Sequence, residues 1–264
     1  MRRLWVFLIS LLWVDPATAT DVYSYKAKEY VIISGGKSPD GHWSVAAHGE
    51  GSDGSDHFGL YLMREPAHER SMQLPTGEHL DTAPLSIAGV WAPDSSCVAV
   101  LYRSDRHVLE LRLVAVANGK SQALDVPALV NAVGHDYLKP AAADALSSRH
   151  FRVAWKGKDQ LALEEFDAFD ATDSVFRPGI ETYLNVDRRG PERTFTDFSA
   201  SAICDISDRK KPHFLDIKPM SGKWEKIVYS PHLLFEPGSG LHSTETAMSS
   251  MEAQAERDKG HPQK

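Results

Sequence analysis

The strongest constraint on the fold of this 264-residue chain is a unit that recurs about four times along its sequence. Each copy has a tight polar turn, a short apolar strand, a second turn and a second strand, followed by a Gly or charged turn into a third strand. Short antiparallel strands of this kind cannot bury a hydrophobic core alone, so the copies must pack against one another. The repeat therefore predicts an all-β fold built from about four similar units.

The openings of the first two copies are the clearest. Residues 38–41 (Ser-Pro-Asp-Gly) precede a predicted strand at 43–47, and residues 91–95 (Trp-Ala-Pro-Asp-Ser) precede one at 97–101. Proline presets φ for the second position of a turn, and Asp and Gly suit the positions that follow it. The segment 97–101 (Cys-Val-Ala-Val-Leu) is apolar throughout, which predicts a strand buried on both faces.

The remaining copies are less regular. A third opens at residues 153–159, where a tryptophan and a small polar turn precede a strand at 161–163. Residues 67–74 line up with 117–124, and both segments predict a hairpin turn followed by a strand.

A fourth copy is expected near the end of the chain. Residues 207–209 (Ser-Asp-Arg) and 222–223 (Gly-Lys) repeat the residue types and the spacing of an earlier pair of turns, at 104–106 and 119–120. Between the earlier turns, apolar and charged residues alternate, which predicts a strand with one buried face.

The segments at residues 38–47 and 91–101 resemble the β-propeller repeats of TolB-type periplasmic proteins and of prolyl-oligopeptidase-like peptidases. The resemblance covers roughly residues 30–230 and is strong at two turns. It implies a propeller-like array, and the alternative is a two-sheet β-sandwich, because such turns are common in β proteins. The peptidases that carry this propeller also need a separate α/β-hydrolase domain, for which this chain has no room, so the resemblance gives no ground to predict peptidase activity.

Residues 1–19 have the three parts of a secretory signal peptide. Arg2 and Arg3 precede an apolar stretch at 4–14, and a small-x-small cleavage site follows at 17–19 (Ala-Thr-Ala). The apolar stretch is shorter than the roughly 20 residues that span a bilayer. We therefore expect a secreted or periplasmic protein with no stable membrane insertion after cleavage.

The rest of the chain is expected to form one domain over residues 20–241. Pro127 and Pro140 each precede residues that favour helix, which predicts a helical insertion at about 127–149. Residues 242–264 have few apolar side chains, so burial cannot offset the entropy lost on ordering. A disordered tail is therefore expected there.

No motif of comparable strength predicts a reaction. The chain lacks the Gly-x-Ser-x-Gly signature of hydrolases and the phosphate-binding Gly-x-x-x-x-Gly-Lys-Ser/Thr, and its twelve histidines include no His-x-x-x-His pair. Residues 34–37 (Ser-Gly-Gly-Lys) lead into a turn and a strand, whereas a phosphate loop needs a helix N-terminus. Residues 238–240 (Gly-Ser-Gly) are typical of a flexible connector. We expect no catalytic residue, cofactor or metal site.

Acidic residues are the remaining candidates for chemistry. Two predicted loops each hold three carboxylates: Glu50, Asp53 and Asp56, and Asp167, Asp170 and Asp173. Calcium prefers several oxygens from one short segment, but neither loop has the EF-hand spacing. Glu164 and Glu165, or the second acidic loop, are the groups that a hydrolase would use as general acid and base, provided that a pocket separates their pKa values.

The cysteines and three of the tryptophans are considered separately, because neither set forms a known sequence motif. Cys97 and Cys204 are the two cysteines of the chain and are expected to be small buried strand residues. A four-unit ring would place them on opposite sides, beyond the Cα separation of about 7 Å that a disulfide allows, and so predicts free thiols. Trp43, Trp91 and Trp155 occur at related points of successive copies, which favours core packing over a stacking platform for sugars or peptides.

The net charge of the chain indicates which class of partner it is not expected to bind. The formal net charge of −7 and the lack of a basic stripe weigh against nucleic acid. We expect an exported, non-catalytic binding or scaffold protein that presents propeller-like loops to a protein, peptide or glycan partner. The alternatives are an exported hydrolase that uses clustered carboxylates and a calcium-dependent adhesion module.

Overall fold

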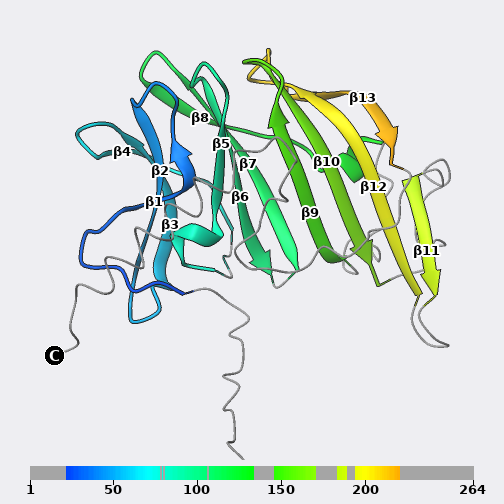
Figure 1. Ribbon diagram of the computed structural model, residues 1–264, viewed down its shortest axis with the longest axis horizontal. Helices are drawn as coiled ribbons and strands as arrows, with labels where there is room; N and C mark the ends of the chain where they lie inside the picture. Colours follow the sequence, from blue (N-terminus) through cyan, green and yellow to red (C-terminus); the bar gives the residue numbers. More distant parts are fainter. Residues whose placement is uncertain are drawn as a thin grey trace, which may run out of the picture.

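The computed structural model describes residues 22–77, 79, 81–105, 107–133, 146–170, 183–188 and 194–220. These residues form thirteen strands of one mixed β-sheet, a single turn of 3-10 helix and one short α-helix (Figure 1). The expected all-β fold with a small helical insertion is confirmed at this level. The expected signal peptide and the expected tail lie outside the described residues.

The strands fall into three units, in which consecutive strands pair antiparallel. Unit 1 consists of β1 (Val31–Lys37), β2 (Trp43–Glu50), β3 (Asp56–Arg64) and β4 (Glu69–Gln73). Unit 2 consists of β5 (Ala88–Trp91), β6 (Cys97–Asp105), β7 (Val108–Ala117) and β8 (Lys120–Leu124). Unit 3 consists of β9 (Leu146–Trp155), β10 (Gln160–Phe169), β12 (Thr194–Asp205) and β13 (His213–Pro219), with β11 (Leu184–Arg188) beside the other half of β12.

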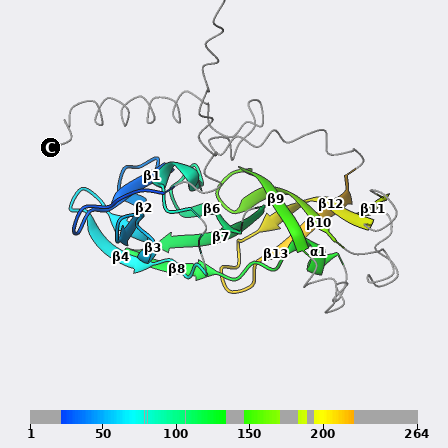
Figure 2. The same ribbon diagram turned by 90° about the horizontal axis from the view of Figure 1, so that it is seen from below.

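Two short parallel contacts join the three units into one sheet. Ser34 of β1 lies opposite Ala88 of β5, and Val108 of β7 lies opposite Arg149 of β9. The first contact depends on glycine, because Gly35 has a φ of +61° and a Cβ there would collide with the carbonyl oxygen of the neighbouring strand. Figure 2 shows the units following one another in sequence order.

Two hydrophobic clusters lie between the units. One packs unit 1 against one face of unit 2, and the other packs the opposite face of unit 2 against unit 3. Val98 and Val100 of β6 belong to the first cluster, whereas Cys97 and Leu101 belong to the second, because successive side chains of a strand point to opposite faces. The predicted burial of β6 on both faces is therefore confirmed.

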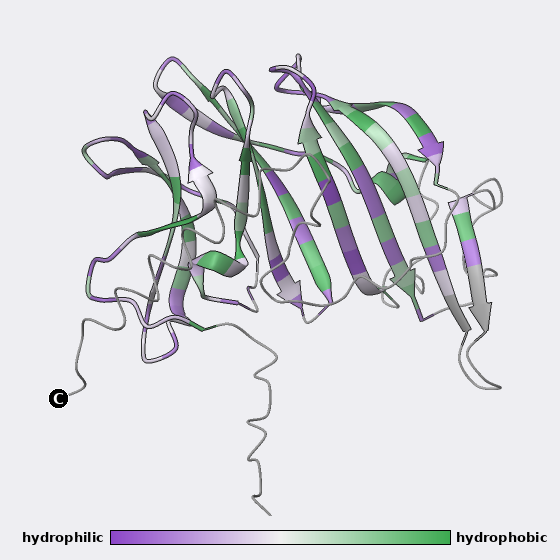
Figure 3. Cartoon of the chain, viewed as in Figure 1, coloured by the Kyte–Doolittle hydropathy of each residue, from purple (hydrophilic) through white to green (hydrophobic). Residues whose placement is uncertain are grey.

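Unit 3, in contrast, buries one face. Buried and half-buried residues alternate along β10 without interruption, and Figure 3 shows both polar and apolar bands along β9 and β10. The inner face of β10 therefore contributes to the core, and its outer face is half-buried and holds Gln160, Ala162, Glu164, Phe166 and Ala168.

The described residues form three units, not the expected array of four. In the described residues the sheet is open, with β11 at one edge and β4 at the other, and it forms neither a ring nor two separate sheets. Residues 207–209 form the turn between β12 and β13, the last hairpin of unit 3, whereas residues 104–105 end β6. The two segments look alike because Ser and Asp stabilise many kinds of turn. Residues 222–223 lie outside the described part of the chain.

Two tryptophans have the same role in successive units. Trp91 ends β5, and its Nε1 donates a hydrogen bond to the carbonyl oxygen of Gly36 in β1 at 2.9 Å. Trp155 ends β9, and its Nε1 donates to the carbonyl oxygen of Val90 in β5 at 2.8 Å. Each indole therefore ties the first strand of its unit to the first strand of the preceding unit.

Trp43 is not equivalent to these two residues, because it begins β2 instead of ending a first strand. The guanidinium carbon of Arg64 lies 5.6 Å from the centre of its ring. Trp43 and Trp91 are 8% and 6% exposed, and Trp155 packs against the second cluster while half-buried. Core packing is thus confirmed for Trp43 and Trp91.

The helical insertion is shorter than expected where it is described. The helix α1 (Leu129–Ala132) follows Pro127, and β9 already begins at Leu146, so the end of the expected segment 127–149 is strand. Residues 134–145 lie outside the described part. Among the described residues, no helix has the length and apolar character to cross a membrane.

Candidate functional site: a face of linked turns

Six turns lie at the same end of the three units, in the upper part of Figure 1. They connect β1 to β2, β3 to β4, β5 to β6, β7 to β8, β9 to β10 and β12 to β13, at residues 38–42, 65–68, 92–96, 118–119, 156–159 and 206–212. We call the surface formed by these residues the turn face. The sequence predicts the existence of most of these turns, and the structure brings them together.

Hydrogen bonds link the turn face across units 1 and 2. The backbone N–H of Asp40 donates to Oγ of Ser95 at 3.0 Å, so the two Pro-Asp turns are in direct contact. Burial acts to raise the pKa of Asp40, but hydrogen bonds from the Ser38 hydroxyl at 2.6 Å and the His42 N–H at 3.0 Å keep that pKa below its usual value. Asp40 is therefore a fixed carboxylate that shapes its turn.

A second link joins the β3–β4 turn to its neighbours. The backbone N–H of Glu65 donates to the carbonyl oxygen of His42 at 2.9 Å, and the Ser44 hydroxyl donates to the Glu65 carboxylate at 2.6 Å. Arg64, which stacks on Trp43, donates from Nη2 to the carbonyl oxygen of Gly119 at 3.1 Å. The turns of units 1 and 2 thus form one connected network.

Arg209 extends the turn face to unit 3. Its Nη2 donates to Oδ1 of Asp159 in the β9–β10 turn at 3.1 Å and to Oγ of Ser96 in the β5–β6 turn at 3.3 Å. The backbone N–H of Ile206 also donates to the carbonyl oxygen of Asp159 at 2.9 Å. One side chain from the β12–β13 turn therefore holds two other turns, one from unit 2 and one from unit 3.

The unit 3 end of the turn face is rich in exposed cations: Lys156, Lys158, Lys210 and Lys211. Asp159 pairs with Arg209 at 3.1 Å and with Lys158 at 3.6 Å, and Asp208 is an exposed carboxylate beside them. A locally cationic corner on a chain of net charge −7 attracts negatively charged groups at short range.

The carboxylates proposed for hydrolysis do not come together. Glu164 and Glu165 point to opposite faces of β10: Glu164 is half-exposed and pairs with Arg152 at 3.3 Å, whereas Glu165 is 1% exposed. The two groups therefore cannot act on the same bond of a substrate.

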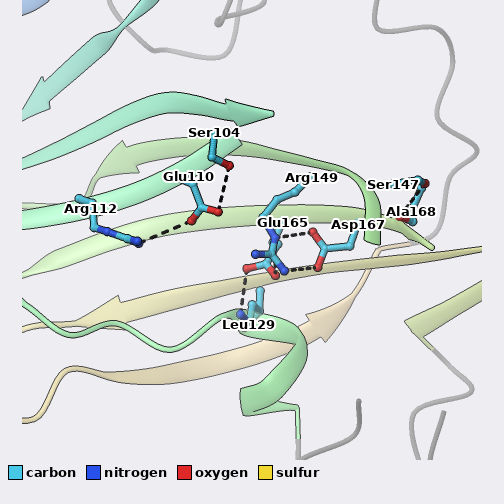
Figure 4. Close-up of polar contacts among 9 residues, drawn as sticks. All are labelled: Ser104, Glu110, Arg112, Leu129, Ser147, Arg149, Glu165, Asp167 and Ala168. Carbon is cyan, nitrogen blue, oxygen red and sulfur yellow. Dashed lines mark hydrogen bonds and ion pairs between the residues drawn. The ribbon is translucent and has the colours of Figure 1, made fainter. Parts of the chain in front are cut away.

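Glu165 instead belongs to a buried cluster between units 2 and 3 (Figure 4). Arg149 makes a two-pronged ion pair with Asp167, at 2.8 and 3.0 Å. Oε2 of Glu165 accepts the backbone N–H of Leu129 at 2.9 Å, and its Oε1 lies 4.0 Å from Nε of Arg149, with no hydrogen-bond partner among the described residues. The cluster fixes the start of α1 against β9 and β10.

Burial and the neighbouring Asp167 carboxylate raise the pKa of Glu165 to about 8, against the opposing effect of Arg149. Glu165 is therefore protonated at neutral pH, while Asp167 is the carboxyl group that pairs with Arg149. A raised pKa is typical of catalytic acids, but both side chains are sealed from solvent. Their geometry supports a structural role.

This protonation predicts how stability depends on pH. The folded pKa of Glu165, about 8, lies above its value of 4.5 in the unfolded chain, so the stabilisation from its proton is complete below about pH 4.5 and is lost as pH rises through 8. Between pH 6.5 and 8.5, urea unfolding of the wild type should show falling stability, by at most about 1.4 kcal/mol per pH unit.

Glu165→Gln is the control, because a neutral amide keeps the shape and removes the titration. The window avoids His79 and His150, whose pKa values burial lowers to about 4, since their contribution is complete above pH 6.5. Equal slopes for the two proteins would show that Glu165 is ionised in the folded state at neutral pH.

The acidic loops do not form cation sites in the described residues. Asp53 accepts hydrogen bonds from the N–H and hydroxyl of Ser55, at 3.1 and 2.8 Å, and no group of three His, Cys, Asp or Glu residues is placed to hold a metal in the described ranges. The prediction that Asp167 lies in the second acidic loop is wrong, because Asp167 lies inside β10 and pairs with Arg149. Asp170 follows that strand, and Asp173 lies outside the described residues.

Sequence reasoning missed Arg149 and Arg209. A signal existed for Arg149: counting outward from the β9–β10 turn places Arg149 opposite Asp167 and Arg152 opposite Glu164. No comparable signal existed for Arg209, which contacts a residue 113 positions away. Comparisons of the chain with protein-family models, curated proteins and solved structures found no match, so the turn face is the basis of the functional argument.

Proposed function

We propose that this protein is an exported, non-catalytic binding or scaffold module that presents the turn face to a protein or peptide partner. The observation that carries the proposal is the hydrogen bonding of six turns from three units into one surface. Loops that are already fixed lose little conformational entropy on binding, so such a surface is suited to recognition.

The charges of the turn face indicate the chemistry of the partner. Four exposed lysines around Arg209 favour a partner with carboxylate groups, and complementary charge raises the rate of association as well as specificity. A glycan is less well supported, because Trp43 and Trp91 are buried and cannot stack on sugar rings. We therefore favour an acidic protein segment or peptide.

The test compares two variants with the same change of charge. One carries Lys156→Glu, Lys210→Glu and Lys211→Glu in the turn face. The control carries Lys26→Glu, Lys28→Glu and Lys218→Glu, which are exposed lysines outside it. A fluorescent oligoglutamate peptide serves as the defined probe, and anisotropy measures its binding at low and at physiological salt.

We expect the wild type and the control to bind the probe and the turn-face variant to lose at least tenfold in affinity. Cross-linking to proteins of the cell envelope, followed by mass spectrometry, should place the cross-links on residues of the turn face. Equal loss in both variants would reduce the effect to overall charge, and cross-links confined to other surfaces would contradict the proposal.

A further inference from the structure

Cys97 and Cys204 lie on facing sides of the interface between units 2 and 3. Cys97 begins β6, and its side chain belongs to the face of unit 2 that packs on unit 3. Cys204 is the second-last residue of β12, and its side chain lies in the same hydrophobic cluster. Both residues are buried, as the sequence predicts. Both also adjoin the turn face, because Cys97 follows one of its turns and Cys204 shortly precedes another.

Arg209 connects the two strand ends that carry these cysteines. Arg209 lies in the turn that follows Cys204, and it bonds Ser96, the residue immediately before Cys97, at 3.3 Å. The positive charge of its guanidinium acts to lower the pKa of the Cys97 thiol. Burial is the main cause that raises the pKa of Cys97 to about 12, and the Cys204 sulfur is close enough to add to that shift.

We propose that Cys97 and Cys204 form an intramolecular disulfide that covalently joins unit 2 to unit 3. Both are thiols in the structure. The expectation of free thiols rested on a ring in which the two residues lie on opposite sides. The sheet is open instead, and the two cysteines belong to neighbouring units that pack face to face.

The reaction is a thiol–disulfide exchange. The two thiols lose two protons and two electrons as the Sγ–Sγ bond forms, and an exchange-active disulfide takes them up and is reduced to two thiols. The thiolate is the attacking species, and burial raises the pKa of both cysteines to about 12. The bond therefore forms during folding, before the interface closes, and the oxidising compartment expected for an exported protein favours it.

Refolding in a defined redox buffer tests the proposal. The reduced, unfolded full chain is refolded with oxidised and reduced glutathione, quenched in acid, unfolded again and alkylated without reductant. We expect a monomer that is lighter by two hydrogens, carries no alkyl group, and yields one linked peptide pair containing Cys97 and Cys204 on digestion. Two alkylated cysteines, glutathione bound to either of them, or a disulfide-linked dimer would each overturn the proposal.

Thermal unfolding gives a second measurement. A disulfide that closes a loop of this size should raise the melting temperature by about 10 °C relative to the same protein in reductant. The matched control is Cys97→Ala with Cys204→Ala, whose melting temperature reductant should leave unchanged. A refolded wild type that melts at the same temperature with and without reductant would contradict a bond that joins the two units.

Discussion

Replacing Arg149 with alanine is expected to lower the free energy of unfolding by about 3–5 kcal/mol. The substitution leaves the Asp167 carboxylate, which is fully buried, without its cation and without its two hydrogen bonds. An unpaired charge in a low-dielectric interior costs far more than the pair itself contributes. Urea unfolding followed by tryptophan fluorescence measures the change.

The hairpin that carries Arg149 also provides its control. Arg152 and Glu164 lie directly opposite one another on the same two strands, as Arg149 and Asp167 do, but on the outer face, where each is more than a third exposed. Solvent screens such a pair, so Arg152→Ala should cost less than about 1 kcal/mol. Similar losses for the two variants would show that the Arg149 cluster is open to water.

A double variant separates the charge from the packing. Arg149→Met combined with Asp167→Leu replaces the ion pair with apolar side chains of similar volume, and such replacements are often neutral. We expect it to be more stable than Arg149→Ala alone. A double variant as unstable as the single one would mean that the hydrogen bonds to this pair, and not its charge balance, determine the stability.

Trp91→Ala is expected to cost about 3–5 kcal/mol, the usual range for truncation of a buried aromatic side chain. Trp91 lies in the cluster between units 1 and 2, and its Nε1 donates to Gly36 at 2.9 Å, so the variant loses both the packing and the link between units. Denaturant unfolding, monitored by far-ultraviolet circular dichroism, measures the loss without relying on indole fluorescence.

Trp91→Phe is the matched control, because it keeps most of the apolar volume and removes the indole donor. Its expected cost is about 1–3 kcal/mol, the penalty for leaving a buried carbonyl without its partner. A stacking platform for a ligand would give the opposite result, with Trp91→Ala near wild-type stability. That outcome would contradict the assignment of Trp91 to the core.

Local turn chemistry explains which parts of the fold the sequence could predict. Residues 38–41 and 91–95 combine proline, Asp and small residues, and these turns form where they were expected. The apolar run at 97–101 predicts burial on both faces, because every side chain in it is apolar, and these residues of β6 are buried on both faces. Each of these signals depends on residues that are neighbours in the chain.

The number of units was not predictable in the same way. Residues 207–209 share residue types with 104–106, but turn chemistry does not encode whether a turn opens a unit or closes one. Whether a sheet closes into a ring depends on the twist and packing of all its strands together, and no single segment determines it. Long-range contacts were missed for the same reason, as with Arg209 and Ser96.

The two indole links have a consequence for how the molecule opens. Unit 2 supplies both the donor Trp91 and the acceptor Val90, so it is bonded on both sides, whereas each end unit is bonded on one. Among the described residues the units form a linear array, and fluctuations of such an array begin at the ends, because an end unit gives up a single one of these interfaces when it separates. A partner that spans the turn face would contact all three units at once and suppress this fraying. Binding of a partner at the turn face would then make the whole sheet more rigid.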